Sequence, residues 1–213
     1  MKKLLLIPAL LLATACATNE GTATYVYTYG SSITAGMVHP NYAEQFAQAV
    51  GLTFPIEKAY GATSLFQGNA QGAPDQYNTI MGDTWSSRSI VLWDAGINDA
   101  IINGDDAAYE AKFTQGVQDV INHFEKSGVK VFVATPNHNC NEARFGTNEL
   151  MDKYGAIVKK LVSEKNNANI VLVDFGDEFN PTTSNTVDCI HPNVEGYKQM
   201  ASVLQEIYAG GDK

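Results

Sequence analysis

The chain has 213 residues, of which 45% are hydrophobic and 17% are charged. This length and composition predict one globular domain with a single buried core. The formal net charge is −9, and the only arginines are Arg88 and Arg144. Because nucleic-acid binding depends on Lys and Arg contacts to phosphates, the composition argues against a nucleic-acid partner.

The N-terminal segment has the layout of a secretory signal peptide. A basic start is followed by an apolar run from Leu4 to Ala13 and by small residues ahead of Cys16. The apolar run is shorter than the ~20 residues that a membrane-spanning helix needs. We therefore expect residues 1–20 to direct export and residues 21–213 to form a single mature domain, located in the periplasm, at the outer membrane or outside the cell.

The segment Ala13-Thr14-Ala15-Cys16 leaves two cleavage outcomes open. It resembles the lipobox of bacterial lipoproteins, in which cleavage before the cysteine leaves a thiol that carries lipid. Lipid chains supply affinity for a membrane, so a lipidated Cys16 would anchor the protein there. Cleavage elsewhere in the small-residue stretch would release a soluble protein. We favour the anchor, because a single cysteine at this position has little other use.

Strand-like and helix-like segments alternate along the rest of the chain, with no repeat, charge block or low-complexity linker between them. This alternation predicts a continuous α/β domain. The last three of the strand candidates are nearly continuous apolar runs, as expected for parallel strands covered on both faces. The candidates span residues 23–30, 53–59, 89–94, 130–134 and 169–174.

Between the strand candidates, apolar residues recur at steps of three and four, which is typical of amphipathic helices. The clearest stripes lie in residues 109–124 and 150–162. A C-terminal helix is expected after Pro192, with Gly210 near its end. Helices alternating with parallel strands form a doubly wound sheet, whose ligands bind beyond the carboxyl ends of the strands. Catalytic residues are therefore expected just after strands.

Four short stretches with chemically active side chains follow strand candidates. Each stretch alone is ordinary turn or capping chemistry. Together they contain the parts that a serine hydrolase needs. The stretches are residues 30–36 (GSSITAG), 59–63 (AYGAT), 96–99 (GIND) and 188–192 (DCIHP).

Ser32, His191 and Asp188 meet the requirements of a nucleophilic serine. A serine hydroxyl needs an imidazole to take its proton and a carboxylate to hold that imidazole in the right tautomer. Asp188 lies three residues before His191, so its carboxylate can reach Nδ1 and leave Nε2 facing Ser32. An oxyanion hole can come from the backbone N–H groups of Ser32 and Gly61 and from the side-chain amide of Asn98.

The four stretches, in this order and spacing, resemble the sequence blocks of the SGNH hydrolase superfamily, the GDSL-type esterases and lipases. The most specific block is DCIHPN at residues 188–193 followed by Gly196-Tyr197, and GIND at residues 96–99 is next. The resemblance implies the same triad and the same oxyanion donors. It also implies a three-layer α/β/α sandwich around a five-stranded parallel sheet like that of flavodoxin, and hydrolysis of esters, thioesters or O-acetyl groups without a metal or cofactor.

The first block departs from the family pattern. The residue before the nucleophile is usually Asp but is Ser31 here, and Ile33 replaces the usual Leu, so the block reads GSSI. The usual Asp is not a member of the triad, so we expect activity to survive. Ser31 is an alternative nucleophile. Ser32 is favoured, because alignment with the family through Gly30, Thr34 and Gly36 places it in register.

Cys140 and Cys189 belong to segments that should be neighbours at the active site. Cys140 lies in the loop after the fourth strand candidate, and Cys189 lies between Asp188 and His191. Disulfides persist in the compartments that exported proteins reach. We hypothesise that the two cysteines form a disulfide that fixes the position of His191. Two free thiols are the alternative.

His39 and His138 could form a metal site together with Asp99, since their loops border the same edge of the predicted sheet. Their spacing matches no metal-binding motif. We interpret both histidines as surface residues and expect neither a metal nor another cofactor.

The favoured function is ester hydrolysis through an acyl-enzyme. Short-chain acyl or O-acetyl esters are the favoured substrates, with small-molecule, lipid, glycan and thioester substrates as the wider range. Transfer of the acyl group to an acceptor other than water would use the same residues. A non-catalytic saccharide-binding surface protein is the remaining alternative, but such a protein has no need of the combination Ser32, Gly61, Asn98, Asp188 and His191.

Overall fold

The computed structural model describes residues 25–53 and 55–210, so the predicted signal peptide and Cys16 lie outside the described residues. The strands are β1 (Val26–Tyr29), β2 (Ile56–Glu57), β3 (Ile90–Asp94), β4 (Lys130–Ala134) and β5 (Ile170–Val173). They form one five-stranded sheet in the order β2-β1-β3-β4-β5, and every neighbouring pair is parallel. This order is that of flavodoxin-like folds. The predicted fold class is confirmed.

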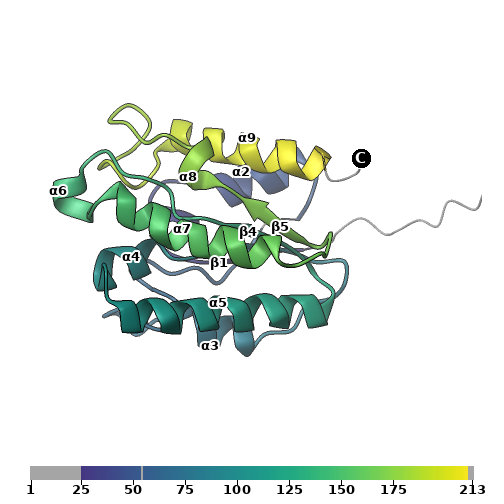
Figure 1. The fold of residues 1–213 in the computed structure, drawn as a ribbon. Coiled ribbons are helices and arrows are strands. Elements are labelled where there is room, and N and C mark those ends of the chain that lie inside the picture. The colour runs from purple at the N-terminus through teal and green to yellow at the C-terminus, as the bar shows by residue number, and fades with distance from the viewer. Residues whose placement is uncertain (1–24, 54, 211–213) are drawn as a thin grey trace, which may run out of the picture.

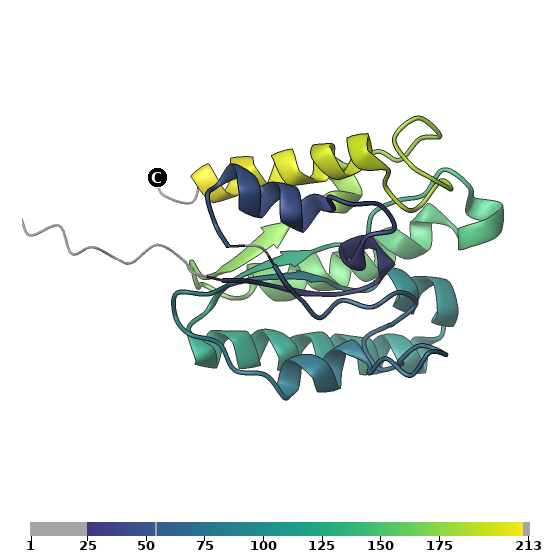
Figure 2. The ribbon, with the colours of Figure 1, turned by 180° about the vertical axis from the view of Figure 1, so that it is seen from behind.

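Helices cover both faces of the sheet and complete a three-layer sandwich. They are α1 (Ser32–Ala35), α2 (Tyr42–Ala49), α3 (Gln76–Met81), α4 (Ile97–Asn103), α5 (Ala107–Ser127), α6 (Glu142–Phe145), α7 (Asn148–Ser163), α8 (Phe175–Glu178) and α9 (Val194–Gly210). Helices α2 and α9 pack together on one face, whereas α3, α5 and α7 form the other layer (Figures 1 and 2). In the part of the chain that the structure describes, no helix is both long and apolar enough to span a membrane.

The central strands are apolar because helices cover both of their faces. Every residue of β3 is buried, and β4 is buried from Val131 to Ala134. Aromatic rings pack in both helical layers. Phe46 of α2 contacts Phe132 of β4 with ring centroids 6.1 Å apart, and Phe113 of α5 contacts Tyr154 of α7 at 4.9 Å. Burial on both faces explains why these strands appear in the sequence as continuous apolar runs.

The second strand is shorter than its sequence predicts. Residues 53–59 predict a strand, but among the described residues of this segment only Ile56 and Glu57 pair with β1. Both residues are exposed, because β2 lies at the edge of the sheet. Pro55 has no N–H to donate to a neighbouring strand. An edge position with little packing accounts for the short strand.

The carboxyl ends of the strands bring the four sequence stretches together. Strands β1 and β3 are neighbours, and the helices that follow them, α2 and α5, lie on opposite faces of the sheet. Such a switch point opens a crevice beyond the strand ends, where doubly wound folds bind ligands. Helices α4 and α6 and the segment between α8 and α9 lie at this same end of the molecule (Figure 1).

Candidate active site

Ser32 is the first residue of α1 and follows closely on the end of β1. Its Oγ lies 2.8 Å from Nε2 of His191, which is 159 residues later in the chain. Ser32 is partly exposed where it lines a cavity, so its hydroxyl is open to a bound molecule. The fold therefore brings the predicted nucleophile and the predicted base to hydrogen-bond distance.

Asp188 is bonded to the other nitrogen of the same ring. Nδ1 of His191 lies 3.0 Å from both carboxylate oxygens of Asp188. An ionised carboxylate only accepts hydrogen bonds, so Nδ1 carries the ring proton and Nε2 is left to accept from Ser32. Burial raises the pKa of Asp188, but hydrogen bonds from the backbone and ring of His191 and from the backbone of Ile190 outweigh it and hold this pKa below its usual value. Asp188 is thus ionised at neutral pH.

The loop that carries Asp188 and His191 folds back on itself. Thr186 and Pro192 form an antiparallel bridge, and the Val187 N–H donates to the carbonyl of His191 over 2.8 Å. Between them, Cys189 adopts a left-handed φ of 76°. This tight reversal explains how two residues three positions apart share several hydrogen bonds.

The loop between β4 and α6 holds this reversal in place. A disulfide joins Cys140 to Cys189, with Cα atoms 4.8 Å apart, so the predicted pairing is confirmed. The Cys140 N–H also donates to the Cys189 carbonyl over 2.9 Å. The Asn137 side-chain amide donates to the Ile190 carbonyl over 3.4 Å. Three contacts from one loop thus act on the two residues that separate Asp188 from His191.

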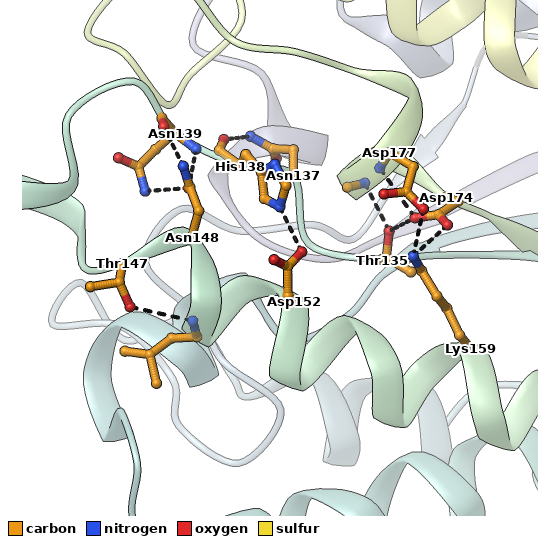
Figure 3. A network of polar contacts seen from close by, with 12 residues as sticks. Thr135, Asn137, His138, Asn139, Thr147, Asn148, Asp152, Lys159, Asp174 and Asp177 are labelled. Carbon is orange, nitrogen blue, oxygen red and sulfur yellow. Dashed lines mark hydrogen bonds and ion pairs between the residues drawn. The ribbon is translucent and has the colours of Figure 1, made fainter.

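Side-chain amides in turn order the loop that carries Cys140 (Figure 3). The Asn139 N–H donates to Oδ1 of Asn148 over 2.9 Å, and the Asn148 amide donates back to the Asn139 carbonyl over 3.0 Å. Asn148 is the first residue of α7, and Thr147 caps that helix by accepting from the Leu150 N–H. The disulfide therefore ties the loop of His191 to a segment that is itself fixed to a long helix.

The predicted oxyanion donors lie beside Ser32 around the same cavity. A Cβ atom placed on Gly61 would lie 3.8 Å from Cβ of Ser32, so the backbone there is close to the nucleophile. The Asn69 amide donates to the Gly61 carbonyl over 2.8 Å and fixes this backbone. The Asn98 amide donates one hydrogen to the Thr63 carbonyl over 2.8 Å. Because a side-chain amide has two N–H bonds, the other hydrogen is left for a ligand.

The cavity at Ser32 and His191 has a volume of about 500 Å³, within the usual range for small-molecule sites. Among the residues that the structure describes, no Asp, Glu, Lys or Arg lines it. Ser32, His191, Gly61 and Asn98 line it. The other polar groups of the wall are the side-chain amides of Asn69 and Gln71. The rest of the wall is apolar and consists of Ile33, Met37, Ala62, Ile97, Ile101, Phe145 and Ile190.

Ser31, the alternative nucleophile, does not share this geometry. Its side chain is buried, and it is not among the residues that line the cavity. Its Oγ donates to Asp94 over 3.2 Å and accepts from the Ile33 N–H over 3.2 Å. This placement favours Ser32 over Ser31 as the residue that meets a substrate.

His39, His138 and Asp99 are not brought together. His39 lies 2.8 Å from the carboxylate of Glu44, and His138 lies 2.7 Å from that of Asp152 (Figure 3). Asp99 is buried, and burial raises its pKa to about 6. Across residues 25–53 and 55–210, no group of three or more His, Cys, Asp or Glu side chains is arranged to hold a metal ion.

Comparison with known sequences identifies the family. The sequence model of the GDSL-like Lipase/Acylhydrolase family matches residues 28–199. The chain belongs to this family. The resemblance predicted from the four sequence stretches is confirmed, and membership makes the chain an ester-hydrolysing enzyme of the lipase and acylhydrolase class. A comparison with curated proteins gives no match.

Solved structures of GDSL proteins and esterases share the fold. A lipolytic protein of the G-D-S-L family from Veillonella parvula has a TM-score of 0.66 at 17% identity, over 88% of this chain and 99% of its own. An acetyl xylan esterase has a TM-score of 0.65 at 20% identity, over 85% and 98%. A catalytic mutant of an acetylxylan esterase from Geobacillus stearothermophilus has 0.61 at 17% identity, over 87% and 94%. At these identities the likeness establishes the fold.

Two residues of this GDSL-like site were not predicted from the sequence. Asp94 ends β3 and accepts hydrogen bonds from Ser31. A carboxylate at the end of the apolar run IVLWD is the signal that could have found it. Arg144 lies on α6, with Nη2 4.0 Å from Oδ2 of Asp188. Nothing in the sequence around Arg144 distinguishes it from an ordinary surface arginine.

Proposed function

We propose that the protein hydrolyses carboxylic esters through an acyl-enzyme on Ser32, with His191 as general base and Asp188 as its orienting carboxylate. The observation that carries this proposal is the continuous hydrogen-bonded chain from Ser32 through His191 to Asp188 at the mouth of a cavity. A buried structural serine would not need an accessible hydroxyl aligned on an imidazole nitrogen.

In the first half of the reaction, His191 Nε2 takes the hydroxyl proton of Ser32 while Oγ attacks the ester carbonyl carbon. The carbonyl oxygen becomes an oxyanion in the tetrahedral intermediate. When that intermediate collapses, the bond to the alcohol oxygen breaks, and His191 returns the proton to the leaving alcohol. The acyl group is then bonded to Ser32, and Asp188 has stabilised the transient imidazolium without itself taking a proton.

In the second half, water replaces the alcohol. His191 takes a proton from the water molecule as the water oxygen attacks the acyl carbon. A second tetrahedral intermediate forms. Its collapse breaks the bond to Ser32 Oγ, which regains its proton from His191. The acid product leaves and the original protonation states are restored.

We assign the oxyanion hole to the backbone N–H groups of Ser32 and Gly61 and to the free side-chain N–H of Asn98. The assignment is supported by the position of all three residues around one cavity and by the hydrogen bond that orients the Asn98 amide. Donors held rigidly at this position cost no reorganisation as charge develops, and the loss of one typically costs ~3 kcal/mol of transition-state stabilisation.

We favour short acyl or O-acetyl esters as substrates. The uncharged, largely apolar wall fits a neutral ester better than a charged one, because an unpaired charge is costly to transfer from water. Two of the solved structures that share the fold are described as acetyl xylan esterases, which makes acetylated xylooligosaccharides natural candidates. The disulfide between Cys140 and Cys189 supports export, since disulfides persist in oxidising compartments.

The direct experiment is a chain-length series of p-nitrophenyl esters from acetate to palmitate, with acetylated xylooligosaccharide as a further substrate. We expect the wild-type protein to hydrolyse the shorter esters and Ser32→Ala to lose ~10⁴-fold or more in kcat/KM. Ser202→Ala is the matched control, because Ser202 is an exposed serine on α9 that donates only to the Lys198 carbonyl. A Ser32→Ala protein with wild-type activity, or a folded wild-type protein that cleaves none of these esters, would contradict the proposal.

A further inference from the structure

Asp94 is a buried carboxylate beneath the nucleophile that takes no part in the proton transfers. The residue is 5% exposed. The Ser31 N–H donates to Oδ1 over 3.0 Å, and Ser31 Oγ donates to Oδ2 over 3.2 Å. The Thr34 hydroxyl also donates to Oδ2. Within residues 25–53 and 55–210, Asp94 forms no ion pair with Lys, Arg or His.

The hydrogen bonds of the Asp94 side chain are donated towards its carboxylate. Because the Thr34 hydroxyl gives its proton to Asp94, its oxygen accepts from the hydroxyl of Tyr42, 2.6 Å away. Burial raises the pKa of Asp94, while the hydrogen bonds from Thr34 and Ser31 oppose that rise. A buried carboxylate without a cation is expensive to maintain. Proteins retain such features mainly where function requires them.

The residues that Asp94 holds flank Ser32 in the chain. Ser31 precedes it, Thr34 follows two positions later, and both are fully buried. The carboxylate also lies against the backbone, since a Cβ atom on Gly30 would be 2.5 Å from Cγ of Asp94. Helix α1 has only four residues, too few to keep an orientation without outside contacts. The contacts to Asp94 supply that orientation.

We propose that Asp94 is a positioning residue for the nucleophile, which fixes the turn at Ser31 and Thr34 so that Ser32 Oγ points at His191. In this chain the carboxylate comes from the end of β3, whereas the residue before the nucleophile is a serine. The inference rests on the proposed function, because it assumes that Ser32 is the nucleophile.

The test compares Asp94→Asn with the wild-type protein. The substitution keeps the shape of the side chain but replaces one acceptor oxygen with an NH₂ group. That group then faces the hydrogen-bond donors of Ser31 and Thr34, which need acceptors. We expect the second-order rate constant for phosphonylation of Ser32 by a fluorophosphonate to fall at least about tenfold, and kcat for p-nitrophenyl acetate to fall with it, while KM changes less than about twofold. A folded Asp94→Asn protein that reacts at the wild-type rate would overturn the proposal.

The matched control is Asp83→Asn. Asp83 also accepts from buried or partly buried groups, Tyr29 and Lys58, but it lies before β3 and does not line the cavity. We expect this variant to lower the melting temperature and to leave the phosphonylation rate unchanged. An equal loss of rate in both variants would mean that Asp94 acts only through stability, and the proposal would fail.

Two further variants cover the case in which Asp94→Asn does not fold. Ser31→Ala and Thr34→Val each remove one hydroxyl that donates to Asp94. We expect each to slow phosphonylation by about two- to fivefold. Wild-type rates in both folded variants would contradict the proposal.

Rescue provides the readout that a purely structural role would not give. Ser31 Oγ already lies against Asp94, so Ser31→Asp in the Asp94→Asn background returns a carboxylate to the same turn. We expect the double variant to react at least about threefold faster than Asp94→Asn, and Ser31→Asp alone, with two carboxylates in contact, to be impaired. A folded double variant no faster than Asp94→Asn would count against the proposal. Failure of the proposed function has a different signature, which is absence of Ser32 phosphonylation in the wild-type protein.

Discussion

The turn that carries Ser32 and the loop that carries Asp188 and His191 meet over one cavity, but different contacts hold them. The turn is buried on either side of Ser32 and is held by hydrogen bonds to Asp94. The loop is more exposed, with Val187 53% accessible, and a disulfide from Cys189 to a neighbouring loop restrains it.

The difference indicates how each region can be perturbed. A buried polar network fails when one donor or acceptor is removed, because the remaining partners are left unsatisfied in the interior. A loop restrained by a cross-link loses order when the cross-link is cut, while its residues stay solvated. The proposed nucleophile and the proposed base should therefore respond to different changes.

The largest expected effect concerns both regions at once. Ser32→Ala and His191→Ala should each lower kcat/KM by ~10⁴-fold or more, and the double variant should be no worse than either, because members of a triad act as a unit. The measurement is kcat/KM for p-nitrophenyl acetate in all three variants. Losses that multiply in the double variant would show that the two regions contribute separately.

The next effect isolates the loop. Cys140→Ser/Cys189→Ser should lower the free energy of unfolding by about 2–4 kcal/mol and kcat by about ten- to hundredfold, because the imidazole is no longer held in place. Denaturant unfolding and steady-state kinetics measure the two quantities. The Ser31 and Thr34 contacts to Asp94 do not involve this loop, so hydrogen exchange in α1 should stay as in the wild-type protein. Full activity in the cross-link-free variant would mean that the backbone contacts suffice.

Lowering the pH should abolish activity before it disorders the loop that carries Asp188 and His191. A serine hydrolase needs its imidazole base unprotonated, so kcat/KM should fall as the pH is lowered. The pKa of Asp188 is lowered, so its stabilising contribution is complete above the pKa of an unfolded aspartate and is lost only as the pH falls through the lower folded value. Circular dichroism should remain constant while activity falls, and activity should return on neutralisation. Parallel loss of both signals would contradict this order of events.

The smallest effect should come from Arg144. Its side chain is 61% exposed and its Nη2 is 4.0 Å from Asp188, so solvent screens the pair. Arg144→Gln should change kcat/KM by less than about threefold. A loss above tenfold would show that the contact from α6 takes a substantial part in holding Asp188.

The sequence was most informative where local pattern decides structure. The apolar runs of β3 and β4 were predicted because helices cover both faces of these strands, and the order of the blocks around Ser32 and His191 was enough to predict the family. The extent of β2 was not predicted, because edge pairing depends on neighbours rather than on composition. Cys140 and Cys189 were paired correctly because topology places their loops side by side.

The contacts of Asp94 could not be predicted from local sequence pattern. Its partners Ser31 and Thr34 are 63 and 60 residues away in the chain, and their hydrogen bonds depend on the register between β1 and β3. Only the packed sheet reveals that an aspartate at the end of an apolar strand faces two hydroxyl groups. The contact of Arg144 with Asp188 likewise depends on how α6 is placed after β4.

The most direct test of the proposed site is to map the adduct of a fluorophosphonate on the folded protein by mass spectrometry. Ser31 and Ser32 are adjacent, so fragment ions between them assign the modified residue. The geometry predicts a single adduct on Ser32 that is absent from Ser32→Ala and strongly reduced in His191→Ala. An adduct on Ser31, or a folded wild-type protein without any adduct, would contradict it.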